Sequence, residues 1–315
     1  MKKQIVSLLA ATILFAGVPS VVHTANAATT SKQQVEVLLD ARKMTFPDAK
    51  PFQDDNSAVM VPIRFVSEKL GAKVGWSKSA GKQVVTLKTD KHSVSMTVGS
   101  ATAVVDGESK TYDSKIILKQ SRTFVPLRLV SEGLGQTVNW DQIGKWVWIG
   151  SKKTPTIDEL NLKTQSLEPY RTYFASMKNN FYFLKSHGKT PYTGAVNVKF
   201  SDLPATTIDD VSIYSMEPYS EGGVEYLKVR STGSANNIIF LTEKGDARYR
   251  MPRESMTKKN ADGTEYNFYD VYTRADLDLS GIVDKKRLTI KDIKYINLLD
   301  ASNTNLVLIT NPWRN

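Results

Sequence analysis

The chain is poor in the side chains that carry most enzyme chemistry. Its 315 residues include three histidines and no cysteine, which excludes a thiolate nucleophile, a zinc knuckle, an iron–sulfur cluster and a disulfide framework. His92 lies in a strand-like run and His187 in a polar turn, so the two do not form an evident catalytic group. The motifs G-x-S-x-G and H-E-x-x-H, a phosphate loop and a dinucleotide glycine fingerprint are all missing. We expect a protein that is not an enzyme and needs no cofactor or metal. An unrecognised hydrolase stays open, because carboxylates are plentiful in the second half, including Glu217, Glu221 and Glu225.

One segment imitates a metal site without completing it. Asp276–Gly281 reads like the opening of a calcium loop, but Arg287 occupies the twelfth position, where the loop needs a bidentate Glu. Leu277 and Leu279 alternate as they would in a strand. We therefore do not predict a calcium site.

The first 27 residues have the features of a secretory signal peptide. A basic start is followed by a mainly apolar run over residues 5–18, and Ala25 and Ala27 supply small residues before a cut after Ala27. The run is short for a membrane span, and no later segment approaches the roughly 20 apolar residues of a spanning helix. We expect a cleaved, secreted or wall-associated chain of a Gram-positive cell, with no membrane span in its mature form.

The composition fits a folded protein with a basic surface. The formal net charge of +10 falls to +8 without the leader, whose only charged residues are Lys2 and Lys3. Net charge favours polyanions in general and does not select one class of them. For an exported chain we expect a cell-wall polymer or an extracellular glycan as partner and no nucleic acid, and we leave the oligomeric state open.

The strongest pattern is an internal repeat. Residues 60–76 and 124–140 are identical at 10 of 17 positions with a constant offset of 64. In each copy a proline begins a helix of about two turns and a glycine ends it, with strand-like stretches before and a hairpin pattern after. The repeat predicts two strand-helix-strand modules folding side by side, at about 34–88 and 92–150.

The charged and aromatic residues of the repeat allow a structural and a functional interpretation. An Arg precedes a Glu by four positions in each helix, an orientation that the helix dipole disfavours, so we predict that these pairs are held by contacts inside the module. A tryptophan ends each copy, and we expect both to be core anchors, although an exposed indole could stack on a sugar. The residues concerned are Arg64, Glu68 and Trp76 in the first copy and Arg128, Glu132 and Trp140 in the second.

The repeated pattern V-P-(I/L)-R-x-V-S-E-x-L-G-x-x-V-x-W resembles the copper amine oxidase N-terminal-like, or stalk, domain of secreted Gram-positive proteins, over about residues 34–151. The resemblance implies a non-catalytic α+β module of cell-surface and wall-associated proteins. The family usually has Asp directly after this Trp, as Asp141 follows Trp140 in the second copy. The first copy has Ser77 instead, which puts the turn after Trp76 in doubt. The motif positions are Pro62, Arg64, Glu68, Gly71 and Trp76, and Pro126, Arg128, Glu132, Gly135 and Trp140.

The oxidase activity in the family name is not expected here. Copper amine oxidases need three histidine ligands and a tyrosine that becomes a quinone within Asn-Tyr-Asp/Glu. Beyond the leader this chain has two histidines, and in its nearest segment, residues 267–270, Phe268 stands where the tyrosine belongs. The ligand count alone excludes the site.

The second half has a different composition and matches no family that we recognise. Residues 152–163 have the composition of a linker. The C-terminal domain, residues 164–315, is predicted to begin with helical character within 164–184 and to continue as many short strands, a pattern typical of a β-sandwich or jelly roll. The predicted fold class is thus α+β, with tandem strand-helix-strand modules followed by a mainly-β domain. Weak ligand candidates in that domain are Tyr219, Tyr249, Tyr266 and Tyr269. A simpler interpretation is structural, because tyrosines in strands are usually half-buried and hydrogen-bonded through their hydroxyl groups.

Two functions fit these observations. The first is a secreted, non-enzymatic envelope protein, in which the repeat is a structural or wall-contact module and the C-terminal domain a binding surface. The second is an extracellular carbohydrate-binding or glycan-processing protein that acts through its C-terminal domain.

Overall fold

The structure is a computed structural model that describes residues 35–175, 184–234, 237–274 and 287–314. Residues 34–315 cluster into one compact unit. The expected leader, residues 1–27, and the calcium-like segment Asp276–Gly281 lie outside the described residues. None of the helices in these ranges is long and apolar enough to cross a membrane.

β-Strands dominate the described residues. The fold is mainly β, with several antiparallel sheets, and the predicted α+β class with strand-helix-strand modules is wrong. The reason is that a helix of seven residues or fewer closes few hydrogen bonds of its own, so pairing between strands satisfies most of the backbone. Among the described residues the α-helices are α1 (Ile63–Lys69), α2 (Leu127–Gly133) and α3 (Glu168–Arg171).

A central sheet joins the two copies of the repeat. Strands β4 and β11 pair antiparallel, and Val61 lies opposite Val125, the residue 64 positions later in the chain. Because each residue of this pair is the repeat counterpart of the other, a pseudo-twofold axis passes between them. The sheet has the order β10-β11-β4-β3, with bounds Ile117–Lys119, Arg122–Pro126, Val59–Pro62 and Phe52–Gln53.

The first outer sheet mixes strands of both copies. The opening strand of the first copy, β1, pairs in parallel with β13, which closes the second copy. A hairpin extends each side of this pair. The sheet has the order β12-β13-β1-β2, with bounds Val138–Asp141, Trp146–Ile149, Glu36–Leu39 and Arg42–Lys43.

The second outer sheet also mixes strands of both copies, here through an antiparallel pair. The hairpin β5-β6 that closes the first copy pairs through β6 with β7 of the second. The two copies therefore interlock instead of folding side by side, and the prediction of separate modules is corrected by this exchange. The sheet has the order β5-β6-β7-β8-β9, with bounds Lys73–Ser79, Lys82–Lys88, Ser93–Thr97, Thr102–Val105 and Glu108–Thr111.

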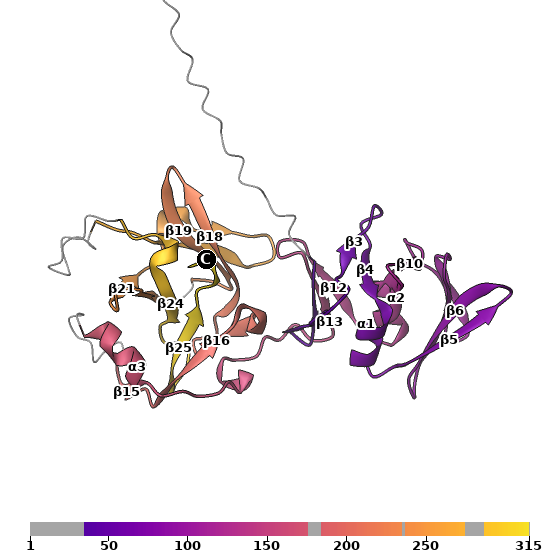
Figure 1. Cartoon of the computed structure of the whole chain (residues 1–315), viewed down its shortest axis with the longest axis horizontal. Coiled ribbons are helices and arrows are strands. Elements are labelled where there is room, and N and C mark those ends of the chain that lie inside the picture. Colours follow the sequence, from indigo (N-terminus) through magenta and orange to yellow (C-terminus); the bar gives the residue numbers. More distant parts are fainter. Residues whose placement is uncertain (1–34, 176–183, 235–236, 275–286, 315) are drawn as a thin grey trace, which may run out of the picture. The chain divides into compact units, whose positions relative to one another are not determined.

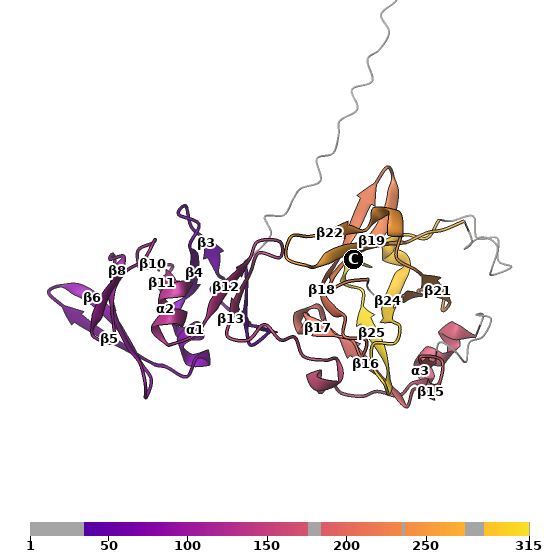
Figure 2. The same cartoon turned by 180° about the vertical axis from the view of Figure 1, so that it is seen from behind.

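The helices α1 and α2 supply the middle layer of this domain. They lie between the two outer sheets (Figures 1 and 2). Each begins directly after its proline, and a glycine with positive φ follows its end: Gly71 at 74° and Gly135 at 75°. Their apolar faces enter one shared core that draws on both copies from Val35 to Ile149, so neither copy has a core of its own.

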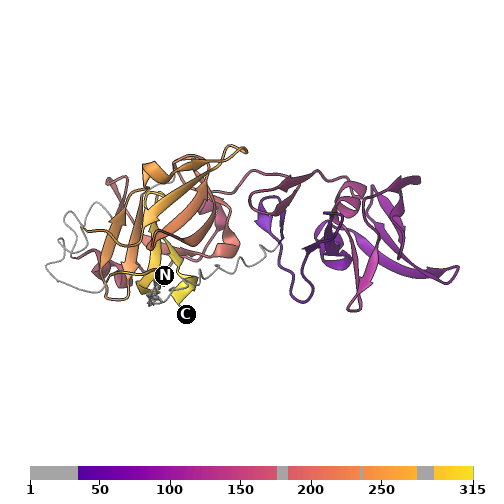
Figure 3. The same ribbon diagram turned by 90° about the horizontal axis from the view of Figure 1, so that it is seen from above.

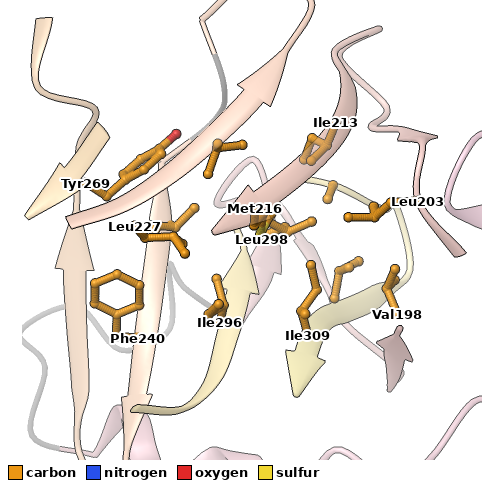
Figure 4. Close-up of a cluster of buried hydrophobic side chains, with 14 of the residues drawn as sticks. Val198, Leu203, Ile213, Met216, Leu227, Phe240, Tyr269, Ile296, Leu298 and Ile309 are labelled. Carbon is orange, nitrogen blue, oxygen red and sulfur yellow. The ribbon is translucent and has the colours of Figure 1, made fainter. Parts of the chain in front are cut away.

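The C-terminal half is a sandwich of two five-stranded sheets. Their facing side chains form one core, in which Leu227 and Tyr269 of one sheet approach Phe240 and Ile296 of the other (Figure 4). This agrees with the β-rich character expected for this half. Sandwich sheet 1 has the order β17-β18-β19-β23-β22, with bounds Ala205–Thr206, Ser212–Glu221, Val224–Ser231, Glu265–Asp270 and Lys258–Lys259.

Sandwich sheet 2 is buried on both faces. Its second face packs against α3 and the short 3-10 helix η2 (Thr172–Phe174), where Tyr170 and Phe174 enter a separate apolar cluster. Only these two short helices occupy the described part of the segment 164–184. Strands of residues 35–149 and of residues beyond 190 form separate sheets (Figure 3). Sandwich sheet 2 has the order β16-β25-β24-β20-β21, with bounds Gly194–Val198, Asn305–Thr310, Ile293–Leu298, Ile238–Thr242 and Ala247–Arg250; a small hairpin, β14-β15, spans Lys185–Ser186 and Thr190–Pro191.

The segment predicted as a linker packs against this sandwich. Ile157 is 2% exposed and belongs to the sandwich core, with Leu160 and Leu162 packed against it. The Thr154 hydroxyl lies 2.5 Å from that of Thr206. Its lysine pair and proline are typical of a loose connector, but the apolar residues that follow the proline anchor it.

The interlock predicts that one copy cannot fold alone. A fragment of residues 34–90 should remain unfolded, because β1 would lose β13 and β6 would lose β7. A fragment of residues 34–150 is the matched control and should melt cooperatively, as followed by far-ultraviolet circular dichroism. A cooperative melt of the shorter fragment would show that each copy is self-sufficient and would contradict the interlock.

Candidate functional site

The pseudo-twofold axis generates two equivalent pockets on the repeat domain. Pocket A, of about 390 Å³, is lined by Arg64 and Trp76 of the first copy. Pocket B, of about 460 Å³, is lined by their counterparts Arg128 and Trp140. The other copy completes each wall: residues 121–123 close pocket A and the segment 56–59 closes pocket B. Both pockets therefore depend on the interlock.

Trp76 lies at the surface and not in the core. Its exposed fraction is 41%, and Leu118, which lines the same pocket, is 57% exposed. These are two of the four large apolar side chains that are exposed among the described residues. The expectation of a core anchor is wrong for Trp76 because β5 is an edge strand whose side chains are mostly exposed, while the core is filled from β6 by Val85 and Leu87.

Trp140 is less open than its counterpart. It is half-buried, and its Nε1–H donates to Oε1 of Gln142 at 2.6 Å. The Lys145 ammonium lies 5.9 Å from the centre of the indole ring. In pocket B the ring and its N–H group thus already have partners within the chain.

The paired Arg and Glu residues are also at the surface, which corrects the expectation that they brace the module interior. Arg128 Nε lies 3.6 Å from Glu132 Oε1, with both side chains about half exposed or more. Arg64 and Glu68 are exposed, and Arg64 makes no hydrogen bond or ion pair with any described residue. The buried face of each helix carries instead its apolar residues and a fully buried serine, Ser67 in α1.

Pocket A contains a second cation that is already neutralised. Arg122 donates from Nε and Nη2 to Oδ2 of Asp48, at 3.0 and 2.7 Å. The hydrogen bonds from Arg122 hold the pKa of Asp48 below its usual range. No sequence pattern pointed to these residues: Leu118 and Arg122 reach the pocket from the second copy, and Asp48 lies outside the repeated motif of the first.

The Trp-Asp end of the second copy contacts the sandwich. Arg230 on β19 is 2% exposed, and its Nη1 donates to Oδ2 of Asp141 at 2.7 Å. Its Nη2 donates to Asp262 at 2.5 Å and its Nε to the Thr264 hydroxyl at 3.1 Å. The guanidinium also lies 4.9 Å from the ring centre of Tyr214, so almost every face of it has a partner. We call these residues the Arg230 cluster.

The repeat supplied one signal for this cluster. The first copy has Ser77 where the second has Asp141, and Ser77 is exposed on β5. The fold of the repeat does not itself require different residues at these two positions. The Asp in the second copy therefore marks the end of the repeat that contacts the sandwich.

The four tyrosine candidates do not form one site. Tyr269 is fully buried in the sandwich core (Figure 4), and burial raises its pKa. Tyr249 packs against the apolar cluster beneath sandwich sheet 2. Tyr219 and Tyr266 share the outer face of sandwich sheet 1, where Tyr219 packs on Phe268 and the Lys228 ammonium lies 3.9 Å from the Tyr266 ring centre.

The titratable residues singled out from the sequence lie apart from one another. His92 Nδ1 is 2.9 Å from Asp106, in a turn of the repeat domain, and His187 Nε2 is 3.6 Å from Asp209 in the C-terminal half. Of the three acids considered for a hydrolase, Glu217 pairs with Lys228 at 2.8 Å. Glu221 accepts from the Tyr219 hydroxyl at 3.3 Å and Glu225 from the Ile290 N–H at 3.4 Å. Within the described ranges no three His, Asp or Glu side chains gather as metal ligands would.

Two interlocked copies of a short motif around a shared core define a stalk-type domain, which is consistent with a non-catalytic role for this part of the chain. Residues 38–149 match the family model of the copper amine oxidase N-terminal domain. The resemblance inferred from the motifs is therefore confirmed, and it covers both copies. The C-terminal half matches no family model, and no curated protein matches the chain. The described residues do not fit a copper site, since the histidines lie apart and no ligand group of three is present among them.

The Arg230 cluster predicts a large and specific loss of stability. Asp141→Ala should lower the free energy of unfolding by about 2–3 kcal/mol, because the buried guanidinium loses one of its two carboxylates. Ser77→Ala, the same change at the exposed counterpart, should stay within about 0.5 kcal/mol of the unmodified chain. Urea unfolding followed by circular dichroism measures both, and equal effects of the two substitutions would contradict the role of the cluster.

The same cluster predicts a dependence on acid. Desolvation raises the pKa of Asp262, but hydrogen bonds from Thr264 and Arg230 outweigh it and the pKa lies below its usual range. Stability from a depressed carboxylate pKa is present above the unfolded value of about 4 and is lost as the pH falls through the folded value. The melting temperature should therefore fall less steeply from pH 5 to 3 in Asp262→Asn than in the unmodified chain.

Thr264→Val provides the control for that measurement. It removes a hydrogen bond that depresses the pKa of Asp262, so the acid loss should begin at a higher pH than in the unmodified chain. Identical pH profiles for all three proteins would show that Asp262 does not contribute.

Proposed function

We propose that this chain is an exported, non-enzymatic protein of the cell envelope that binds glycan through the repeat domain. Pockets A and B are its contact sites, and the C-terminal sandwich offers a second binding surface. The observation that carries the proposal is the exposed tryptophan of pocket A, next to an arginine, with the same residue pair repeated in pocket B.

The pocket chemistry suits a sugar ring. An exposed indole offers a flat apolar face with a polar edge, and Trp76 and Leu118 together leave apolar surface in contact with water. A sugar has apolar C–H faces that can cover such a surface and hydroxyl groups that need hydrogen-bond partners. Gln83, Ser121 and Thr123 line pocket A and supply those partners.

The duplication supports binding to a polymer. One chain carries two related pockets, and two weak contacts to one polymer bind more strongly than either contact alone. A wall polysaccharide offers many identical ligand units to both pockets. The signal peptide predicted at residues 1–27 supports an envelope location, and the basic mature chain favours an anionic surface.

A second candidate is glycan binding through the C-terminal half. Tyr219 and Tyr266 lie on the outer face of sandwich sheet 1, with Lys228 and Phe268 between them. The two tyrosine rings and the Lys228 ammonium can contact a sugar chain, whereas Phe268 is fully buried and only supports Tyr219. Changes at Tyr219 and Tyr266 separate this candidate from the first.

Trp76 provides the test of the main proposal. Trp76→Ala should weaken co-sedimentation of the mature chain with purified Gram-positive cell walls by about tenfold, equivalent to about 1.4 kcal/mol. Val104→Ala is the control, because Val104 is 43% exposed on β8 of the same domain and lines neither pocket. It should leave binding unchanged.

Three outcomes decide between the candidates. Loss of binding in Trp76→Ala alone supports the pockets. Loss only in Tyr219→Ala with Tyr266→Ala supports the sandwich face instead. Wall binding that none of these substitutions changes would contradict both.

A further inference from the structure

Pockets A and B occupy equivalent positions in the two copies but differ in how their arginines are paired. In pocket A the Arg122 guanidinium is bonded to Asp48, whereas Arg64 has no partner among the described residues. Pocket A therefore contains one cation that is not compensated by the chain, next to the exposed Trp76.

The equivalent groups of pocket B already have partners. Arg128 lies 3.6 Å from Glu132 and 3.8 Å from Asp113. The Trp140 N–H donates to Gln142, and the Lys145 ammonium lies near the indole ring. An anionic ligand would have to displace these contacts, and carboxylates near the arginine would repel it.

We infer that pocket A binds acidic saccharides, with the sugar ring on Trp76 and its carboxylate on the Arg64 guanidinium. The inference rests on the proposed function and adds the ligand class and the site that selects it. A guanidinium presents a planar pair of N–H donors that matches a carboxylate, and it stays charged at any physiological pH. Arg64 keeps these donors free, so binding breaks no existing ion pair.

Trp76 and Arg64 together restrict the class of ligand further. Trp76 and Leu118 recognise an apolar ring face, and Arg64 recognises an acid carried by that ring. A polymer with charge but without rings would engage only the arginine. A neutral saccharide would engage only the tryptophan. Uronic-acid saccharides engage both.

The experiment measures binding of the full mature chain to two matched probes by isothermal titration calorimetry. The probes are a galacturonic-acid tetrasaccharide and its carboxyl-reduced counterpart, which differ only in the acid. At low salt the acidic probe should bind about tenfold more tightly. This preference should shrink in 0.5 M salt, because exposed charge pairs are screened.

Substitutions assign the preference to a pocket. Arg64→Gln should abolish the preference while binding of the neutral probe is kept, and Arg64→Lys should retain part of it. Arg128→Gln is the matched control and should leave the preference intact. Both arginine side chains are exposed, so these variants should melt at the temperature of the unmodified chain.

The outcomes separate this inference from the proposed function. A preference that survives in Arg64→Gln, or that is lost in Arg128→Gln, overturns the assignment to pocket A. Equal binding of the two probes, still dependent on Trp76, overturns the acidic ligand but keeps the glycan function. A glycerol-phosphate oligomer that bound as tightly as the acidic tetrasaccharide would also overturn the acidic-saccharide inference, since that oligomer has no ring. If neither saccharide binds, the proposed function itself fails.

Discussion

The pairing of β4 with β11 is the contact on which the rest of the repeat domain depends. It places Val61 opposite its own counterpart Val125, and this fixes an axis that relates α1 to α2 and the closing hairpin β5-β6 to β12-β13. Each outer sheet must then be built from strands of both copies, because the hairpin that closes one copy ends beside the opening strands of the other. The shared core and both pockets follow from that exchange. A slip of one residue in this register would move the apolar side chains of β4 and β11 to the opposite face and remove all three features together.

The two copies differ in sequence at positions where only the second copy contacts the sandwich. Trp146, Trp148 and Asp141 contact Tyr214 and Arg230 of the sandwich. The counterparts of these three residues in the first copy are Lys82, Val84 and Ser77, which lack both the aromatic surface and the carboxylate. A buried guanidinium without a carboxylate would be costly. A carboxylate is therefore required at position 141, whereas its counterpart position 77 has no buried cation to pair with.

Local features of the fold could be predicted from the sequence, but the strand partners could not. A proline before and a glycine after each helix, and the turns of the hairpins, are determined within a few residues and appear where expected. Pairing between copies is non-local, and a repeat pattern is equally compatible with modules that stand alone and modules that exchange strands. The exposure of Trp76 is unpredictable for the same reason. It depends on whether β5 is a central or an edge strand, and this is decided by its strand partners. In the structure β5 lies at a sheet edge.

Helix stability does not explain the orientation of Arg64 and Glu68 on their helix. With the cation nearer the helix N-terminus, such a pair opposes the helix dipole, and even a well-oriented exposed pair contributes only about 0.3–0.5 kcal/mol. In the first copy the two side chains do not pair, since Arg64 has no partner among the described residues. An arginine at this position thus adds almost nothing to folding. Its position does place a free guanidinium on the wall of pocket A beside an exposed indole, and charge and ring can act together there only on a ligand that carries both an acid and an apolar face.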